Sequence, residues 1–218
     1  MMNEAVMVFV IDDDQSVRRS MARVLDAAHY AAELFESASK FLAREAHPGP
    51  SCVIVDVQMP GLNGIELQKA LIERGREEQL IFVTGHANVP MCAEAMKAGA
   101  VDFLPKPFKR LELLQSIDRA LVRSTEQRRR AFEKNQARAL IEKLTPREFQ
   151  VMELVATGLL NKQIGAELGM AEKTVKTHRA HVMLKLGITS VAELMRVLQK
   201  AEGGPRSSGL RAYLRPKG

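Results

Sequence analysis

The sequence predicts an α/β fold, a doubly wound five-stranded parallel sheet, joined by a helical linker to an all-α domain of four helices. In residues 1–119 short apolar runs alternate with amphipathic stretches, which is the pattern of parallel strands separated by helices. In residues 145–201 amphipathic stretches follow one another without strand-like runs. The charge also divides, because residues 1–119 carry 13 Lys and Arg against 17 Asp and Glu, whereas residues 120–218 carry 19 against 9. A basic second half favours nucleic acid as its partner.

The composition argues against a membrane protein. Of the 218 residues 27% are charged, and no apolar run approaches the roughly 20 residues that span a bilayer. The first ten residues lack the basic segment of a signal peptide. Cys52 and Cys92 lie far apart without the spacing of metal ligands, as is usual for reduced thiols. We therefore expect a cytoplasmic protein without membrane contact.

The first half of the chain predicts five strands with helices between them. The expected strands are Val6–Ile11, Ala31–Phe35, Cys52–Val55, Leu80–Val83 and Val101–Leu104. The expected helices are the amphipathic stretches Ser16–Ala27, Gly64–Arg74 and Pro90–Ala98. In sheets of this kind a ligand binds at the carboxyl ends of the strands, where the strand order reverses.

Polar residues follow four of these strands. The first ends in Asp12-Asp13-Asp14, the third in Asp56 and the fourth in Thr84, and the fifth leads into Lys106. Carboxylates that share one crevice stay ionised more easily beside a cation. Mg²⁺ prefers oxygen ligands, needs few carboxylates and keeps waters that a phosphoryl donor can replace. The sequence therefore predicts a magnesium site that serves phosphate chemistry.

This half resembles the receiver domain of two-component response regulators, which has a flavodoxin-like or CheY-like fold. The resemblance covers roughly residues 5–124 and rests on the acid pair and on the motifs "CVIVDVQMPG", "IFVTGH" and "DFLPKPF". It implies that Asp56 accepts a phosphoryl group from a sensor histidine kinase. It also implies that Mg²⁺ is bound by Asp12, Asp13, Asp56 and the backbone carbonyl of Gln58.

The same resemblance assigns further roles near the strand ends. Lys106 would neutralise phosphoryl oxygens, and Thr84 would donate its hydroxyl to one of them. Phe103 occupies the aromatic switch position, and the Lys106–Pro107 bond would be cis. Asp14 lies beyond the acid pair and is expected to cap the following helix. A haloacid dehalogenase-type phosphatase combines the same residue types, but it carries Asp-x-Asp on its first strand, unlike the contiguous acids of this chain.

The chain is predicted to comprise a receiver at 1–124, a helical linker at 125–142, a helical domain at 143–202 and a basic tail at 203–218. The linker is rich in helix-forming residues and lacks Gly and Pro. The tail, "GGPRSSGLRAYLRPKG", has four cations and no acid and is expected to be disordered. The helices expected in the third segment are Pro146–Thr157, Lys162–Leu168 with Asn161 as its cap, Glu172–Leu186 and Val191–Ala201.

The second and third of these helices form a helix-turn-helix arrangement, because a short helix, a glycine-containing turn and a longer helix follow one another. On the longer helix Val175, Val182 and Leu186 share one side and are expected in the core. The candidates for reading DNA bases lie near its start and are Lys173, Lys176, Thr177 and Ala180. The candidates for phosphate contacts beside them are His178, Arg179 and His181.

The segment from Leu144 to about Leu198 resembles the LuxR-type DNA-binding domain, since "LTPRE", "GLLNKQI", "TVKTH" and "KLG" occur in order at the family spacing. In that family the glutamate of LTPRE, here Glu148, pairs within the domain. Ala171 occupies the cap of the recognition helix, where Ser or Thr is frequent. A receiver followed by this domain is similar to the FixJ/NarL regulators, and "TGHANVP" and "FLPKPF" are closest to the FixJ side.

We therefore expect a transcription regulator, not an enzyme, whose partners are a sensor histidine kinase and double-stranded operator DNA. Phosphorylation is expected to produce a homodimer that binds DNA through Glu172–Leu186, and RNA polymerase is a further candidate partner. The alternative is an interaction switch whose helical domain binds protein. Steeply salt-dependent binding of duplex DNA separates the two hypotheses.

Overall fold

The computed structural model describes residues 5–86 and 88–202. Within these residues the chain forms two compact units that divide between Arg128 and Arg129. The basic tail predicted at 203–218 lies outside the described residues. None of the described helices is long and apolar enough to cross a membrane.

The first unit contains the predicted five-stranded parallel sheet. Its strands are β1 (Met7–Ile11), β2 (Ala32–Phe35), β3 (Ser51–Asp56), β4 (Gln79–Thr84) and β5 (Asp102–Pro105), in the order β2-β1-β3-β4-β5. Because the chain first extends the sheet to one side of β1 and then to the other, the order reverses at β1 and β3. The carboxyl ends of these two strands therefore border the crevice where ligands of such sheets bind.

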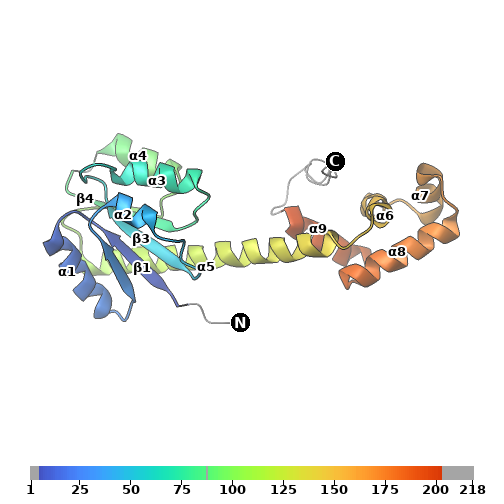
Figure 1. Ribbon diagram of the computed structural model, residues 1–218, viewed down its shortest axis with the longest axis horizontal. Helices are drawn as coiled ribbons and strands as arrows, with labels where there is room; N and C mark the ends of the chain where they lie inside the picture. Colours follow the sequence, from blue (N-terminus) through green and yellow to red (C-terminus); the bar gives the residue numbers. More distant parts are fainter. Residues whose placement is uncertain (1–4, 87, 203–218) are drawn as a thin grey trace. The chain divides into compact units, whose positions relative to one another are not determined.

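Helices cover both faces of the sheet, as Figure 1 shows. They are α1 (Gln15–Asp26), α2 (Ala38–Ala43), α3 (Gly64–Glu73), α4 (Val89–Lys97) and α5 (Arg110–Ile141). Alternate strand residues supply the two cores. Phe9, Val53 and Phe82 face α2 and α3, whereas Val8 and Ile54 face α1 and α5. The near-continuous burial of β1, β3 and β4 follows from this double coverage.

Two sequence features fix where helices begin in the first unit. Asp14 occupies the N-cap of α1 and its Oδ1 accepts a hydrogen bond from Ser16 N at 2.7 Å, which confirms the predicted cap. Gly64 begins α3 so close to β3 that a Cβ atom there would lie 2.6 Å from the carbonyl oxygen of Asp56. A residue without a side chain is therefore required at the position that brings α3 next to the end of β3.

The second unit is helical, as predicted. After the end of α5 it contains α6 (Pro146–Ala156), α7 (Asn161–Leu168), α8 (Glu172–Leu186) and α9 (Val191–Glu202). Its core combines side chains of all five helices, among them Ala137, Val151, Ile164, Val182 and Leu198. The helix α5 spans 32 residues without interruption and includes residues 125–141, most of the segment expected to be a helical linker.

Two details of the helices differ from the predictions. Asn161 was expected to cap the second helix of this domain, but it is the first residue of α7 and Leu160 stands at the N-cap. Leu160 offers no capping side chain, but its backbone N donates a hydrogen bond to Oε1 of Gln163, the third residue of the helix, at 2.8 Å. The short helix α2 was not predicted, because six residues are too few for a helical period to be recognised.

Candidate functional site

The carboxyl ends of β1, β3 and β5 meet around the ammonium group of Lys106. Its Nζ donates hydrogen bonds to Asp12 Oδ2 at 2.8 Å and to Asp56 Oδ2 at 2.6 Å. Asp12 directly follows β1, Asp56 is the last residue of β3, and Lys106 directly follows β5. Residues separated by up to 94 positions in the chain are thus joined by two ion pairs at one edge of the sheet.

The second oxygen of each carboxylate accepts a backbone hydrogen bond from the residue two positions later. Asp14 N donates to Asp12 Oδ1 at 2.9 Å, and Gln58 N donates to Asp56 Oδ1 at 2.9 Å. Burial raises the pKa of Asp12 and outweighs the opposing effect of Lys106. Burial also disfavours the charged form of Lys106, but its hydrogen bonds to Asp12 and Asp56 prevail and raise its pKa. Lys106 therefore remains a cation at the centre of the site.

The three adjacent aspartates have three different environments. Asp12 is 2% exposed and binds Lys106, whereas Asp14 is exposed and caps α1. Asp13 is also exposed, and its carboxylate makes no hydrogen bond or ion pair to any residue that the structure describes. Asp13 is thus the acid of this loop that remains available for a ligand from solution.

Thr84 lies on β4, the neighbour of β3, and Phe103 lies on β5 at the edge of the sheet. Thr84 is completely buried at the end of β4; its Oγ1 accepts a hydrogen bond from His86 N at 3.2 Å, and its carbonyl oxygen accepts one from Lys106 N at 2.7 Å. Phe103 is half-buried on β5, and its ring lies 6.1 Å from that of Phe82. The Lys106–Pro107 bond is cis, as the resemblance implied.

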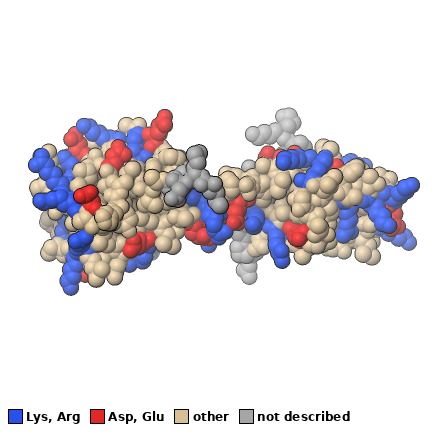
Figure 2. Space-filling model, turned by 90° about the horizontal axis from the view of Figure 1, so that it is seen from below, with Lys and Arg blue, Asp and Glu red and all other residues tan. Residues whose placement is uncertain are grey.

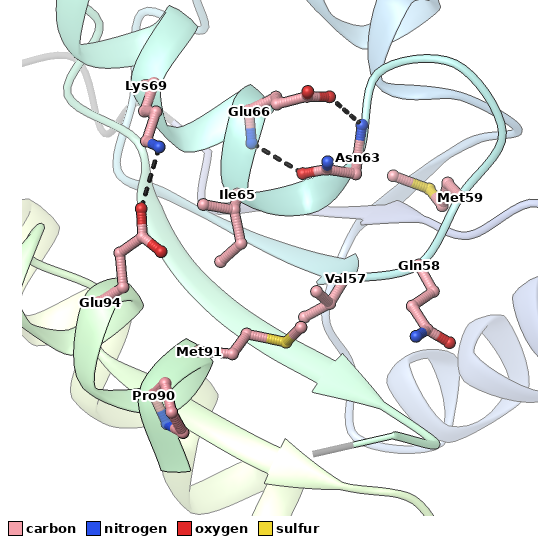
Figure 3. Close-up of a pocket in the computed structure, with 10 residues that line it drawn as sticks. All are labelled: Val57, Gln58, Met59, Asn63, Ile65, Glu66, Lys69, Pro90, Met91 and Glu94. Carbon is pink, nitrogen blue, oxygen red and sulfur yellow. Dashed lines mark hydrogen bonds and ion pairs between the residues drawn. The ribbon is translucent and has the colours of Figure 1, made fainter. Parts of the chain in front are cut away.

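A groove with a volume of about 680 Å³ opens beside Asp56, between α3 and α4. Figure 3 shows apolar side chains such as Val57, Ile65 and Met91 lining it, and the ion pair between Lys69 Nζ and Glu94 Oε1 (2.9 Å) at its edge. Behind this ion pair the buried Gln68 donates from Nε2 to the carbonyl oxygen of Ala95 in α4 at 3.1 Å. Two neighbouring residues of α3 therefore hold the C-terminal half of α4.

In the second unit, the four residues predicted to read DNA bases are all exposed on α8: Lys173, Lys176, Thr177 and Ala180. Val175, Val182 and Leu186 are buried on the opposite side, as predicted. Ala171 stands at the N-cap and provides no side-chain hydrogen bond, also as predicted. In the view of Figure 2, Lys and Arg side chains are more frequent than Asp and Glu over the part of the chain that contains this helix.

The three residues predicted to contact phosphates are placed differently from one another. Arg179 is half-buried and its Nη1 donates to Asn161 Oδ1 at 3.1 Å, so it joins α8 to the start of α7. His178 has a buried Nδ1 without a hydrogen-bond partner among the described residues. His181 is exposed, and its Nδ1 lies 3.7 Å from Glu148 Oε1. Of the three, His181 is the most accessible to a ligand.

Comparisons with known proteins assign both units. The family model for "Response regulator receiver domain" matches residues 8–118, and that for "Bacterial regulatory proteins, luxR family" matches residues 142–198. Nodulation protein W of Bradyrhizobium diazoefficiens is 44% identical over 87% of this chain and 84% of its own length. The transcriptional regulatory protein FixJ of Azorhizobium caulinodans is 40% identical over 94% of this chain and 97% of its own.

The chain belongs to the response regulator family. Among solved structures, the response regulator StyR superposes with a TM-score of 0.80 at 42% identity, covering 90% of this chain and 99% of that one. Full-length FixJ superposes with a TM-score of 0.53 at 38% identity, covering 90% and 97%. The resemblance to FixJ-like regulators is thereby confirmed, and so is the combination of a receiver with a LuxR-type DNA-binding domain. Such a response regulator is a transcription regulator whose partners are a kinase and DNA.

Glu148 is a buried charged residue in the DNA-binding domain of this response regulator. Its Oε2 accepts hydrogen bonds from Lys185 Nζ at 2.6 Å and from Thr145 N at 2.8 Å. The hydrogen bond from Lys185 is the main reason that the pKa of Glu148 is lowered to about 2. Glu148 thus joins the start of α6 to the end of α8, which confirms the structural role that its family position implied.

Sequence reasoning missed contacts between residues that have no periodic relation. Arg18 of α1 donates from Nη1 to the carbonyl oxygens of Asp12 and Asp13, at 2.6 and 2.9 Å. A single arginine on an amphipathic helix is indistinguishable in the sequence from a solvated surface residue. Its position four residues after a helix-capping aspartate, within reach of the acidic loop, is the one available signal.

We predict that the stability of the DNA-binding domain depends on pH through Glu148. Because the pKa of this carboxyl is lower in the folded state than its ordinary value of 4.5, its contribution is complete above that value and is lost as the pH falls toward 2. Lys185→Met should reduce the free energy of unfolding at neutral pH by about 1.5 kcal/mol. This is the lower end of the range for hydrogen bonds to charged groups, since the side chain of Lys185 is 35% exposed.

Urea unfolding, followed by the helical circular dichroism signal between pH 7 and pH 3, measures this contribution. Lys173→Met is the matched control, because Lys173 is exposed on the same helix without an ion pair among the described residues. The Lys185→Met protein should lose less stability on acidification than the control. Equal acid sensitivity of the two variants would contradict the role assigned to the Glu148–Lys185 pair.

Proposed function

We propose that Asp56 of this response regulator accepts a phosphoryl group from the phosphohistidine of a sensor histidine kinase. The observation that carries the proposal is the position of Lys106 Nζ, 2.6 Å from Asp56 Oδ2 at the carboxyl edge of the sheet. Asp56 is buried, and a fixed cation already lies where the negative charge of a transferred phosphoryl group would develop.

In the proposed transfer an oxygen of Asp56 attacks the phosphorus atom of the donor. The bond between phosphorus and the kinase nitrogen breaks, its electron pair stays on the imidazole, and the imidazole takes up a proton from solvent. Gln58 N holds one carboxylate oxygen and Lys106 the other, so the nucleophile is oriented before the donor arrives. The buried hydroxyl of Thr84 and the ammonium of Lys106 would then contact the phosphoryl oxygens.

The residues of the site also suit Mg²⁺. Within the described ranges no group of three His, Cys, Asp or Glu side chains forms a ready metal cluster. Mg²⁺ keeps several waters and also binds phosphate oxygens, so its protein ligands need not form a closed cluster before it binds. We propose Asp12, Asp13, Asp56 and the carbonyl oxygen of Gln58 as the protein ligands. When bound, the cation would supply positive charge against the phosphoryl oxygens.

We predict that Asp56→Asn abolishes phosphorylation by a small donor such as acetyl phosphate in the presence of Mg²⁺. Intact-mass spectrometry should show one added phosphoryl group on the wild-type protein and none on the variant, because an amide oxygen is a poor nucleophile. Asp26→Asn is the control, since Asp26 is the last residue of α1 and lies outside the site. Phosphorylation of Asp56→Asn at the wild-type rate would show that another residue is the acceptor.

We further propose that α8 reads operator DNA in the major groove. Lys173, Lys176, Thr177 and Ala180 are the base-reading candidates, because they are exposed on the N-terminal half of a helix that follows a turn. The hydroxyl of Thr177 donates to the carbonyl oxygen of Lys173 at 3.2 Å and would present its methyl group and oxygen in a fixed orientation. His178, Arg179 and His181 are proposed to lie near the phosphates.

We predict that Lys176→Ala lowers the preference for operator over random duplex DNA by about 1–3 kcal/mol, the value of a good base contact. The matched control is Lys200→Ala, which removes the same charge from α9. Fluorescence anisotropy with both duplexes at several salt concentrations separates base reading from phosphate contact. A uniform loss on both duplexes with a shallower salt slope would demote Lys176 to a phosphate contact. Absence of salt-dependent DNA binding in the wild-type protein would favour the protein-binding alternative.

Phosphorylation is proposed to favour a homodimer by changing the surface formed by α4 and β5. The phosphoryl group adds charge and acceptor oxygens that the hydroxyl of Thr84 can approach. Thr84 would then release His86 N, and the half-buried ring of Phe103 could occupy space vacated near Phe82. Two recognition helices joined in one dimer match the two half-sites of an operator.

We predict that beryllofluoride with Mg²⁺ converts the protein from monomer to dimer in sedimentation velocity. Thr84→Val keeps the shape of the side chain but removes the hydroxyl. It should weaken the dimer about tenfold or more, since a hydrogen bond to a charged group is worth about 1.5–3 kcal/mol. Thr84→Ser retains the hydroxyl and should dimerise. Enhanced operator binding by beryllofluoride without any change in sedimentation would exclude dimerisation as the mechanism.

A further inference from the structure

Arg18 holds the backbone of the acidic loop from the side of α1. Its Nη1 donates to the carbonyl oxygens of Asp12 and Asp13 at 2.6 and 2.9 Å, across five or six positions of the chain. These carbonyls belong to consecutive peptide groups. One guanidinium nitrogen therefore fixes the orientation of both peptides between which the side chain of Asp13 is attached.

The other hydrogen bonds of this loop are local. Asp14 N donates to Asp12 Oδ1, and Ser16 N donates to Asp14 Oδ1, each across two positions. The carboxylate of Asp13 has no partner of its own in the described part of the chain, so only the backbone sets its direction. Among the described residues that contact the two peptides of Asp13, only Arg18 belongs to helix α1 and not to the loop itself.

We propose that Arg18 is a positioning residue for magnesium binding, because it orients the peptides that carry Asp13. This inference rests on the magnesium site of the proposed function. It assigns to Arg18 no contact with the cation or with the phosphoryl group. The guanidinium acts through the two carbonyl oxygens and thereby limits the directions that the Asp13 carboxylate can adopt.

A simple electrostatic role and a positioning role of Arg18 predict opposite changes in Mg²⁺ affinity when this residue is replaced. A guanidinium near a cation site repels the cation, so its loss should strengthen magnesium binding. Loss of a positioning contact should instead weaken it, as happens when an outer partner of a metal ligand is removed. The sign of the change in affinity therefore decides between the two roles.

The test measures Mg²⁺ affinity by titrating the ¹⁵N-labelled full-length protein with MgCl₂ and following the amide signals of the acidic loop. Arg18→Met, which keeps an apolar stem but no donor, should raise the dissociation constant about tenfold, the lower end of the usual loss. Arg18→Lys, which can donate to these carbonyls, should recover part of the affinity. Arg19→Met is the matched control, because Arg19 is exposed and makes no contact with the loop.

A second measurement needs no metal. In magnesium-free protein the amide of Asp14 should exchange its hydrogen faster in Arg18→Met than in Arg19→Met, because the acidic loop is less ordered without the hydrogen bonds of Arg18. Equal or tighter Mg²⁺ binding by Arg18→Met, or unchanged exchange, would overturn the positioning role. If the wild-type protein itself bound no Mg²⁺, the proposed function would fail instead, and the two failures are thereby distinguished. The amide spectrum of each variant reports whether it is folded.

Discussion

The contact of Lys106 with Asp12 and Asp56 is the interaction on which the arrangement of the receiver depends. Two buried aspartates would repel each other and lose hydration if no cation lay between their carboxylates. Lys106 offsets both costs and joins the ends of β1, β3 and β5. The strands adjacent to it, the close approach of α3 at Gly64 and the acidic loop before α1 are all positioned around this cation.

The same contact holds the carboxylates of Asp12 and Asp56 in fixed orientations. Each of the two buried carboxylates has both oxygens engaged, one by Lys106 and one by a backbone N–H. In the proposed transfer, the phosphoryl group would offer Lys106 new oxygens with greater negative charge than a carboxylate. The ammonium would then transfer its hydrogen bonds to the phosphoryl group while remaining in place, and the balance of charge in the crevice would change around a fixed cation.

The sequence predicted most of the fold because local patterns and global architecture agree. Apolar runs mark the buried strands, and polar residues after four of them mark the carboxyl edge of the sheet. Asp12, Asp56 and Lys106 could therefore be placed together before their distances were known. The helix α2 and the N-cap of α7 escaped prediction, since one helix is too short to show a period and the other begins at an apolar residue. Arg18, Gln68 and the Arg179–Asn161 pair were not predictable, because long polar side chains choose partners across the fold without any sequence spacing.

The helix α5 has a consequence for how the protein can be divided. The family matches end at residue 118 and resume at 142, yet the helix contributes Leu121 to the receiver core and Ala137 to the core of the other unit. Ser124 also accepts a hydrogen bond from Ser51 N at the start of β3. A separately produced receiver must therefore extend beyond Ser124, and an isolated DNA-binding fragment must begin before Ala137. The limits of the two family matches thus lie inside the folding units, and fragments cut at those limits would expose apolar surface that the intact chain buries.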